Sequence, residues 1–220
     1  MTQEIEQTLL KEIEELKQKV TLLNNNEKTN KPTFQYSKIR DKELDNLVDI
    51  EKKIRTNEFD NWFNNDISIP NDLDNFFQEI IDDNIDLVDE YNEEDLKVNI
   101  IIPILNKVRF KSFENEFRDF YELPIRYETD TFIFNGTTDF VVSKGLVSGV
   151  ELNGWNEIKG AFIIGARWHF VILKKLDKDS YEYFVSKSFD SMRIEDIRDI
   201  FKNLLVIKQE IIDKITEEKI

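Results

Sequence analysis

The stretch that decides the fold is residues 131–152, TFIFNGTTDFVVSKGLVSGVEL, which is rich in β-branched and aromatic residues and in glycine. All six glycines of the chain lie between Gly136 and Gly165, a pattern typical of tight turns and close backbone approach within a sheet. We predict strands at residues 131–134, 138–143, 146–152, 161–165, 167–175 and 181–186. The predicted hairpin turns are Phe134-Asn135-Gly136, Ser143-Lys144-Gly145 and Leu176-Asp177-Lys178-Asp179.

Helices are predicted on both sides of this sheet region. One is expected over residues 38–55, and a second opens after Pro70 with apolar residues at helical spacing from Leu73 to Ile81. A third begins after Asn92 as its cap, carries three acids in its first turn and runs to Val108, with Pro103 interrupting it. A fourth, over residues 194–215, closes the chain. This order of elements predicts an α+β fold with a mostly antiparallel sheet.

The N-terminal 24 residues are predicted to form a coiled-coil helix. Leu9, Ile13, Leu16, Val20 and Leu23 recur at alternating spacings of four and three, which is the seam of a heptad repeat. We expect two copies of the chain to pair through residues 5–23; the alternative is a helix packed on its own domain. Residues 25–33 read as a linker.

The rest of the chain, residues 34–220, is expected to be one domain. Its first part, residues 34–90, reads as acidic and helical, and residues 91–220 hold the sheet core and the closing helix. This division rests on the change in charge and on the position of the glycines.

Composition excludes several classes of protein. The formal net charge is −15, so the overall field does not favour nucleic acid, and contact with RNA or DNA needs a local basic patch. Zero cysteines and one histidine exclude a disulfide scaffold, thiolate zinc and an imidazole cluster within one chain. No apolar stretch approaches the length of a membrane span and no signal peptide opens the chain, so we expect a cytoplasmic protein without membrane contact.

The acidic charge is concentrated in one segment. Between Arg55 and Lys97 there are fourteen acidic residues and no basic one, although apolar residues at helical spacing indicate ordered helices. We expect this segment to bind the basic groove of a nucleic-acid-binding protein or ribonucleoprotein; the alternative is an acidic surface that serves only solubility. The candidate partner-binding residues are Asp82, Asp83, Asp86, Asp89 and Glu90.

A basic and aromatic segment follows the third helix. Its phenylalanines are expected to enter the core rather than to stack on bases. The candidate contacts to RNA or DNA are Lys107, Arg109, Lys111, Arg118 and, further along the chain, Arg167.

Two carboxylates lie on neighbouring predicted strands of the sheet. Asp139 and Glu151 are separated by the turn at residues 143–145, so both could reach one divalent ion. Hard Mg²⁺ prefers such oxygen ligands and can activate water for attack on a phosphate. The two residues are therefore candidate metal ligands.

Residues 93–106, EEDLKVNIIIPILN, followed by Gly136-Thr137-Thr138-Asp139-Phe140-Val141-Val142, resemble the PD-(D/E)XK nuclease superfamily. More narrowly, residues 90–175 are similar to the nuclease domain at the N-terminus of type I restriction enzyme motor subunits. The resemblance implies a restriction-endonuclease-like core with a helix acid, a strand Asp and a Glu-x-Lys motif on the paired strand. It assigns these roles to Glu94, Asp139 and Glu151, with Mg²⁺ as the cofactor of an active enzyme.

The chain departs from this family pattern at the catalytic centre. Asn153 stands where Glu-x-Lys places its lysine, although Glu157-Ile158-Lys159 offers the right side chains six residues later. The segment that follows Glu151 is too short for the helix that the family places there, so the core reads as truncated.

Three classes of function remain open. The function we predict is that of a nuclease-derived protein without catalysis or cofactor, an inhibitor of a bacterial nucleoprotein defence system of the anti-CRISPR or anti-restriction type. The first alternative is an active Mg²⁺-dependent endonuclease that uses Asp139, Glu151 or Glu157, Lys159 and Glu94. The second is a dimeric structural or adaptor protein.

Overall fold

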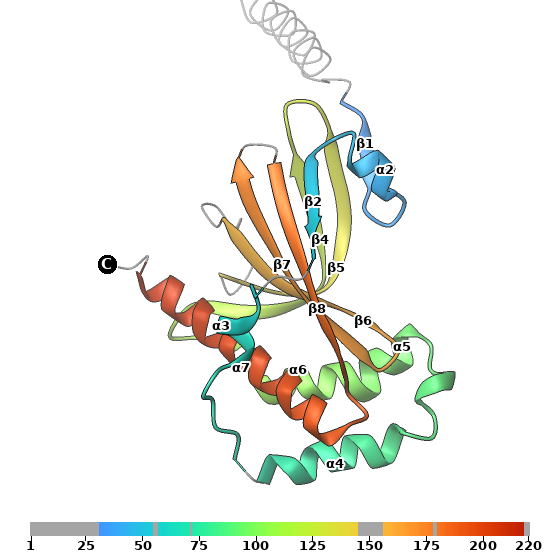
Figure 1. Cartoon of the computed structure of the whole chain (residues 1–220), viewed down its shortest axis with the longest axis vertical. Coiled ribbons are helices and arrows are strands. Elements are labelled where there is room, and N and C mark those ends of the chain that lie inside the picture. Colours follow the sequence, from blue (N-terminus) through green and yellow to red (C-terminus); the bar gives the residue numbers. More distant parts are fainter. Residues whose placement is uncertain (1–30, 55–56, 71, 145–155, 178–179, 218–220) are drawn as a thin grey trace, which may run out of the picture. The chain divides into compact units, whose positions relative to one another are not determined.

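The structure is a computed structural model that describes residues 31–54, 57–70, 72–144, 156–177 and 180–217. It confirms the α+β class, with two mixed sheets and a long C-terminal helix (Figure 1). The described chain divides into two compact units. The smaller one contains residues 31–39 and 124–137, and the larger one residues 40–123 and 138–217.

The first sheet has the strand order β1-β5-β4-β3. Its strands are β1 (Thr33–Gln35), β3 (Lys111–Ser112), β4 (Phe117–Glu128) and β5 (Ile133–Lys144). β4 and β5 each pass from one unit into the other, because the unit boundaries fall at residues 123 and 137. β1 pairs parallel with the start of β5, whereas β3 pairs antiparallel with the start of β4.

Aromatic rings hold the smaller unit together. The ring of Phe134 lies 5.2 Å from that of Tyr36, 5.7 Å from Phe34 and 5.0 Å from Phe132. Lys31 adds polar contacts, because its ammonium donates to Glu128 at 3.0 Å and to the carbonyl of Thr129 at 2.8 Å.

The turn predicted at residues 134–136 was wrong, because β5 runs without interruption through these residues. Phe134 and Asn135 pair with Phe34 and Gln35 of β1. Gly136 is needed here for close approach and not for a turn, since a Cβ atom at this position would lie 2.2 Å from Cδ2 of Tyr36. The predicted strands 131–134 and 138–143 are therefore parts of one strand.

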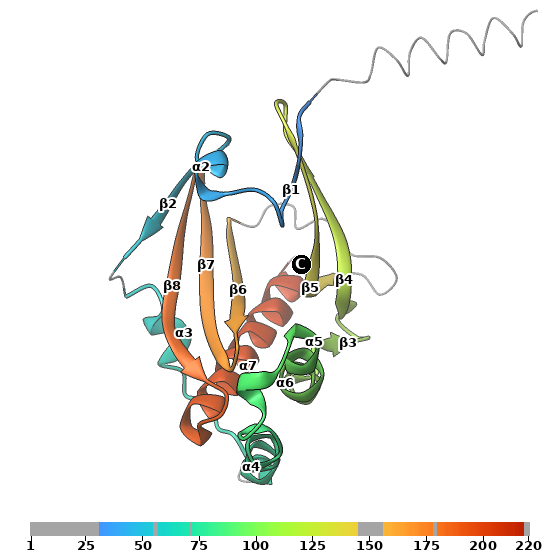
Figure 2. The same ribbon diagram turned by 90° about the vertical axis from the view of Figure 1, so that its right-hand side faces the viewer.

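The second sheet lies in the larger unit and has the strand order β2-β8-β7-β6 (Figure 2). Its strands are β2 (Asp49–Lys53), β6 (Glu157–Ile164), β7 (Arg167–Asp177) and β8 (Ser180–Asp190). β6, β7 and β8 pair antiparallel, as predicted, and Gly165 takes the positive φ of 56° that the turn between β6 and β7 requires. β2 instead pairs parallel with β8.

The helix predicted over residues 38–55 was wrong for most of its length. Only α2 (Asp41–Leu44) is helical, and residues 49–53 form β2. Ile50 and Lys53 of this strand are half-buried beside β8, while Asp49, Glu51 and Lys52 are exposed. Pairing with the edge of β8 outweighs the helical preference of this mixed segment, because strand preference depends mainly on the neighbours available.

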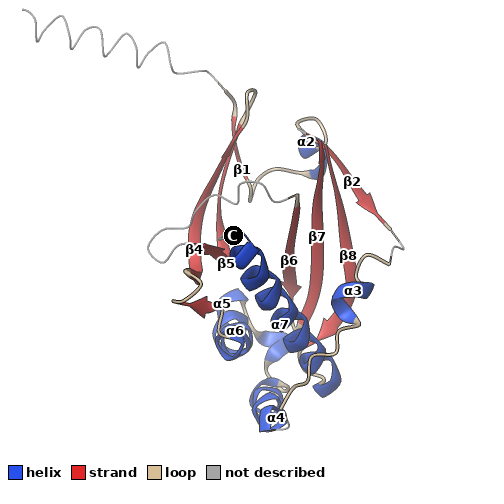
Figure 3. Ribbon diagram, turned by 90° about the vertical axis from the view of Figure 1, so that its left-hand side faces the viewer, coloured by secondary structure: helices blue, strands red, loops and turns tan. Residues whose placement is uncertain are grey.

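Helices cover one face of this second sheet, and α4 and α6 pack against α7 (Figures 1 and 3). The helical elements of the larger unit after α2 are α3 (Asp60–Phe63), α4 (Asp72–Asn84), η1 (Val88–Glu90), α5 (Glu93–Leu96), η2 (Lys97–Ile101), α6 (Ile102–Val108) and α7 (Ile194–Glu217). The predictions of α4, of α7 and of the Asn92 cap are confirmed. Pro103 lies in the first turn of α6, and the π-helical η2 precedes it, because proline cannot donate into a regular helical ladder.

One apolar core joins these helices to the sheet. Its largest fully buried side chains include Trp62, Phe77, Trp168, Phe170 and Phe189. The aromatic segment after α6 contributes to burial as predicted, since Phe110, Phe117 and Phe120 are buried, whereas Phe113 is 75% exposed.

The predicted coiled coil over residues 1–24 and the predicted strand at residues 146–152 lie outside the described residues. No helix in the described ranges is long and apolar enough to cross a membrane.

Candidate functional site

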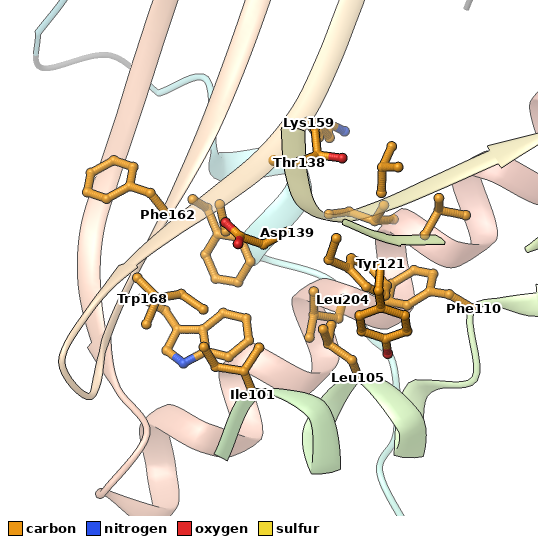
Figure 4. Close-up of a pocket in the computed structure, with 18 of the residues that line it drawn as sticks. Ile101, Leu105, Phe110, Tyr121, Thr138, Asp139, Lys159, Phe162, Trp168 and Leu204 are labelled. Carbon is orange, nitrogen blue, oxygen red and sulfur yellow. The ribbon is translucent and has the colours of Figure 1, made fainter. Parts of the chain in front are cut away.

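The larger unit contains a cavity of about 850 Å³ next to the residues that the sequence marked as catalytic (Figure 4). Its lining is mostly apolar and comes from α5, η2, α6, β4, β5, β6, β7 and α7. In Figure 4, Lys159 and Thr138 lie on one side of the cavity, and Ile101 and Leu105 lie on the other. A cavity of this size and polarity is typical of a ligand site in a folded domain.

A cluster of charges at the cavity is centred on Lys97. The Lys97 Nζ lies 2.7 Å from Glu122 Oε1, 3.3 Å from Asp139 Oδ1 and 4.0 Å from Glu94 Oε2. The hydrogen bond to Glu122 is the main cause that raises the pKa of the Lys97 ammonium, and Asp139 adds to it. Lys97 is therefore protonated at neutral pH and joins η2 to β4 and β5.

A second cluster at the same cavity is centred on Lys159. This side chain, 15% exposed, donates a hydrogen bond to Glu210 of α7 and lies 3.8 Å from Glu157 Oε1. Its ammonium also lies 5.2 Å from the centre of the Trp62 ring. Lys159 thus neutralises two carboxylates and ties the edge strand β6 to the core.

The structure brings three of the predicted catalytic residues together. Asp139, Glu157 and Lys159 all line the one cavity, and Glu94 approaches it through Lys97. Glu151, the fifth candidate, lies outside the described residues, as does Asn153.

The carboxylates of Glu94, Asp139 and Glu157 all contact lysine ammonium groups. In the described part of the chain, no three His, Cys, Asp or Glu side chains form a group that could hold a metal ion. Asp139, the candidate ligand that the structure describes, accepts a hydrogen bond from the Lys97 ammonium instead.

Sequence reasoning missed Lys97, Glu122 and Glu210. The spacing of Glu94 and Lys97 at i, i+3 on one helix was a usable signal, because such pairs face each other. Nothing in the local sequence marks Glu122 or Glu210, which meet their lysines only through the packing of β4 and α7.

The basic candidates divide between two places. Lys111 and Arg118 lie opposite each other in the β3–β4 pair, shortly after Lys107 and Arg109 at the end of α6. Arg167 is instead at the start of β7 in the second sheet, paired in register with Asp190. Four of the five candidates therefore lie in or next to α6 and the β3–β4 pair, and Arg167 lies in the other sheet.

The acidic candidates lie at the end of α4 and in the segment that follows. The acidic surface consists of Asp82, Asp83, Asp86, Asp89 and Glu90. All five are exposed, and none forms an ion pair with a cation of the described chain; Asp82 accepts a hydrogen bond from Gln78 at 2.8 Å. Two large apolar side chains lie among them, Ile85 at 50% exposure and Leu87 at 53%.

The segment that carries these acids is anchored at both ends. Asn84, buried at the end of α4, donates to the carbonyl of Ile80 at 2.7 Å and accepts from the hydroxyl of Tyr91 at 2.7 Å. Between these anchors, η1 fixes the backbone of Asp89 and Glu90. The acidic surface is therefore displayed on ordered backbone.

Neither a family model, nor a curated protein, nor a solved structure matches this chain.

Proposed function

We propose that the protein is a nuclease-derived binding protein without catalysis, which inhibits a bacterial nucleoprotein defence system of the CRISPR or restriction type. Its acidic surface would occupy a basic groove that otherwise holds nucleic acid. The protein would act in the cytoplasm, where such a system works, and would require no cofactor.

The observation that carries this proposal is the composition of the acidic surface. Five exposed carboxylates without a cation partner in the described chain surround Ile85 and Leu87, whose side chains are half exposed. Clustered charge of one sign attracts a partner of the opposite sign and accelerates association, whereas exposed apolar side chains can bury area in a protein partner.

The anchoring of the segment supports imitation of phosphates. A carboxylate on a fixed backbone offers a negative charge at a constant position, so less conformational freedom is lost on binding. The Asn84–Tyr91 hydrogen bond and the burial of Phe77 and Ile81 in the core supply this fixation. Arg198 of α7 adds to it through Asp74, which it contacts at 2.6 Å.

Under this proposal, the charged side chains at the cavity of Figure 4 stabilise the fold rather than take part in catalysis. Lys97 and Lys159 each contact two or more carboxylates and so link strands to helices. A lysine held in this way is less available to stabilise charge on a phosphate.

The proposal is tested by competition on a defined nucleoprotein complex. The chain is added to the complex loaded with labelled nucleic acid, and release of the label is followed. The wild type should displace the label, whereas Asp82→Lys, Asp83→Lys and Asp86→Lys together should abolish displacement.

A matched control changes the net charge equally at another place. Asp45→Lys, Asp213→Lys and Glu217→Lys reverse three exposed acids outside the acidic surface. Asp213 accepts a hydrogen bond from Gln209 as Asp82 does from Gln78, so the two triple variants are similar in local chemistry. Displacement should survive in the control; equal loss in both triple variants would refute a specific role for the acidic surface.

A second candidate function is a Mg²⁺-dependent endonuclease. The observation that favours it is the shared cavity of Asp139, Glu157 and Lys159. Incubation with Mg²⁺ or Mn²⁺ and varied DNA and RNA should give no product above background under the first proposal. Cleavage that Asp139→Ala abolishes would establish the second.

Two partner proposals accompany the main one. The patch of Lys107, Arg109, Lys111 and Arg118 would allow local contact with RNA or DNA. Pairing through residues 5–23 would make the protein a homodimer, and a dimer presents two acidic surfaces to one partner.

A further inference from the structure

A second cavity in the larger unit, of about 810 Å³, is lined by cations in a chain that is strongly acidic. It opens where β2 ends, beside β8 of the same sheet and the helices α3 and α7 (Figure 3). The charged side chains of its lining are Lys52, Lys53, Lys187, Lys202, Asp60 and Asp199. We call it the lysine pocket.

Three of these lysines have no acidic partner. Lys53 pairs with Glu51, but Lys52, Lys187 and Lys202 form no ion pair with any carboxylate of the described chain. Lys187 lies over the ring of Phe189, 4.9 Å from its centre, which leaves its charge uncompensated. Like charges gathered around one cavity repel each other, and an anion bound among them removes that cost.

An independent observation comes from Asn203 of α7. This residue is 2% exposed and lines the lysine pocket. Its backbone carbonyl accepts a hydrogen bond from Trp62 Nε1 at 2.9 Å, and the residue contributes a side-chain amide to the lining of the lysine pocket. A side-chain amide can both donate and accept hydrogen bonds, so it can bind a planar polar group of a ligand in the pocket.

The lysine pocket also offers a flat apolar contact. Phe63 of α3 lines it and is half-buried; Phe59 stacks on one face of its ring at 5.0 Å, and Phe170 and Phe189 pack against it edge-on, which leaves the other face as the candidate contact for a ligand. Ile54, 74% exposed, adds apolar surface to the lining. Nucleobases are planar heterocycles, and any of them can stack on an aromatic ring of this kind.

We propose that the lysine pocket binds a nucleotide. The phosphate would lie between Lys52, Lys187 and Lys202, the base would stack on Phe63, and the amide of Asn203 would bind the edge of the base. Asp60 and Asp199 would accept hydrogen bonds from the ribose hydroxyls. This site goes beyond the acidic surface and does not depend on it, because the two share no residue.

The test is titration calorimetry of the full chain with inorganic phosphate, ribose 5-phosphate, the four nucleoside monophosphates and a 5′-phosphorylated RNA octamer. At least one nucleoside monophosphate should bind about tenfold more tightly than ribose 5-phosphate, since stacking and the Asn203 contact add to the charge term. Lys52→Ala and Lys202→Ala should each weaken that binding about tenfold, because each removes a charge-assisted contact.

Lys175→Ala is the matched control, because Lys175 is exposed on β7 and does not line the lysine pocket. The affinity of this variant for the nucleoside monophosphate should stay within about twofold of the wild type, because a single distant surface charge has only a small effect on binding. Circular dichroism shows whether each variant folds. Lys52 is exposed, so its replacement should leave the fold intact, and Lys52→Ala keeps the test valid if Lys202→Ala fails to fold.

Four results would each overturn the proposal. In the first, no nucleoside monophosphate binds at millimolar concentration, and in the second, inorganic phosphate binds as tightly as the monophosphates do. In the third, Lys175→Ala weakens binding as much as Lys52→Ala and Lys202→Ala do. In the fourth, the RNA octamer binds but the monophosphates do not.

Discussion

At the scale of single residues, Lys97 is the most informative position in the chain. Its ammonium lies 2.7 Å from Glu122, 3.3 Å from Asp139 and 4.0 Å from Glu94, so it contacts three carboxylates. The side chain is 17% exposed, whereas its three partners are 61–73% exposed. Solvent therefore screens the cluster strongly, and its contribution to stability is modest.

Replacing Lys97 by Met should lower the free energy of unfolding by about 0.5–1 kcal/mol at pH 7. The contacts raise the pKa of Lys97 above its unfolded value, so their contribution is fully present below about pH 10.4 and is lost as pH rises through the folded pKa. Urea unfolding should therefore give a constant difference from pH 6 to 9 that shrinks above pH 10.4.

The control for this substitution is Lys175→Met, an exposed lysine of β7 with no ion pair in the described chain. It should change the free energy of unfolding by less than about 0.5 kcal/mol. An equal effect of both substitutions, or a Lys97 effect that grows at high pH, would contradict the role given to the cluster.

Residue chemistry could be predicted from the sequence only where it follows local spacing or residue type. Asp139, Glu157 and Lys159 were found by type, and they do share a cavity. Lys97 with Glu122, and Lys159 with Glu210, were not found, because partners 25 and 51 residues apart meet only through tertiary packing. The lysine pocket was missed for the same reason, since its cations come from three distant segments.

At the scale of elements, α4 is fixed by one apolar stripe and one ion pair. Phe77 is fully buried and its ring lies 5.4 Å from that of Phe201 on α7. Asp74 on the same helix binds Arg198 of α7. The apolar contact dominates, because burying a phenylalanine stabilises a fold more than a partly exposed ion pair does.

Phe77→Ala should therefore lower the free energy of unfolding by about 3–5 kcal/mol, the cost of a cavity in the core. Phe113→Ala is the matched control, since Phe113 is 75% exposed. Its effect should stay below about 0.5 kcal/mol. If denaturant unfolding gave comparable losses of unfolding free energy for Phe77→Ala and Phe113→Ala, α4 would not pack as described.

Tyr91→Phe should loosen the segment between α4 and α5. It removes the donor to Asn84, so the free energy of unfolding should fall by about 1 kcal/mol. Amide hydrogen exchange should become faster for residues 85–90, which this bond helps to fix. Tyr121→Phe is the control, because Tyr121 is exposed and its hydroxyl forms no hydrogen bond within the described chain. This substitution should leave the exchange of residues 85–90 unchanged.

Elements with a strong periodic pattern were predicted well, and those that depend on a distant neighbour were not. The stripe from Leu73 to Ile81 and the Asn92 cap gave α4 and α5 correctly. β2 was predicted as helix because Ile50 follows Leu44 and Leu47 at helical spacing, although it fits an edge strand as easily. β4 was not predicted, because its polar residues follow no alternation that marks a strand.

At the scale of the whole molecule, the net charge of −15 should govern association. Carboxylates concentrated on one surface steer a cationic partner, and salt weakens this attraction. The charge also repels a second copy of the chain, so pairing of copies needs a specific apolar seam.

The heptad pattern of residues 5–23 supplies such a seam, so the full chain should be a dimer. Light scattering should give twice the chain mass at tens of micromolar concentration. Removal of residues 1–24 should halve that mass, and circular dichroism should show that the sheet is retained. A full-length monomer under these conditions would disprove the prediction.

The dissociation constant for the isolated nucleoprotein partner tests the central claim most directly, measured for the wild type and both triple variants at low and high salt. Reversal of Asp82, Asp83 and Asp86 to Lys should weaken binding by about 100-fold or more and flatten its dependence on salt. Reversal of Asp45, Asp213 and Glu217 should weaken it by about threefold or less, because distant exposed charges are screened. Equal affinities of the two triple variants would contradict the claim that the acidic surface is where the partner binds.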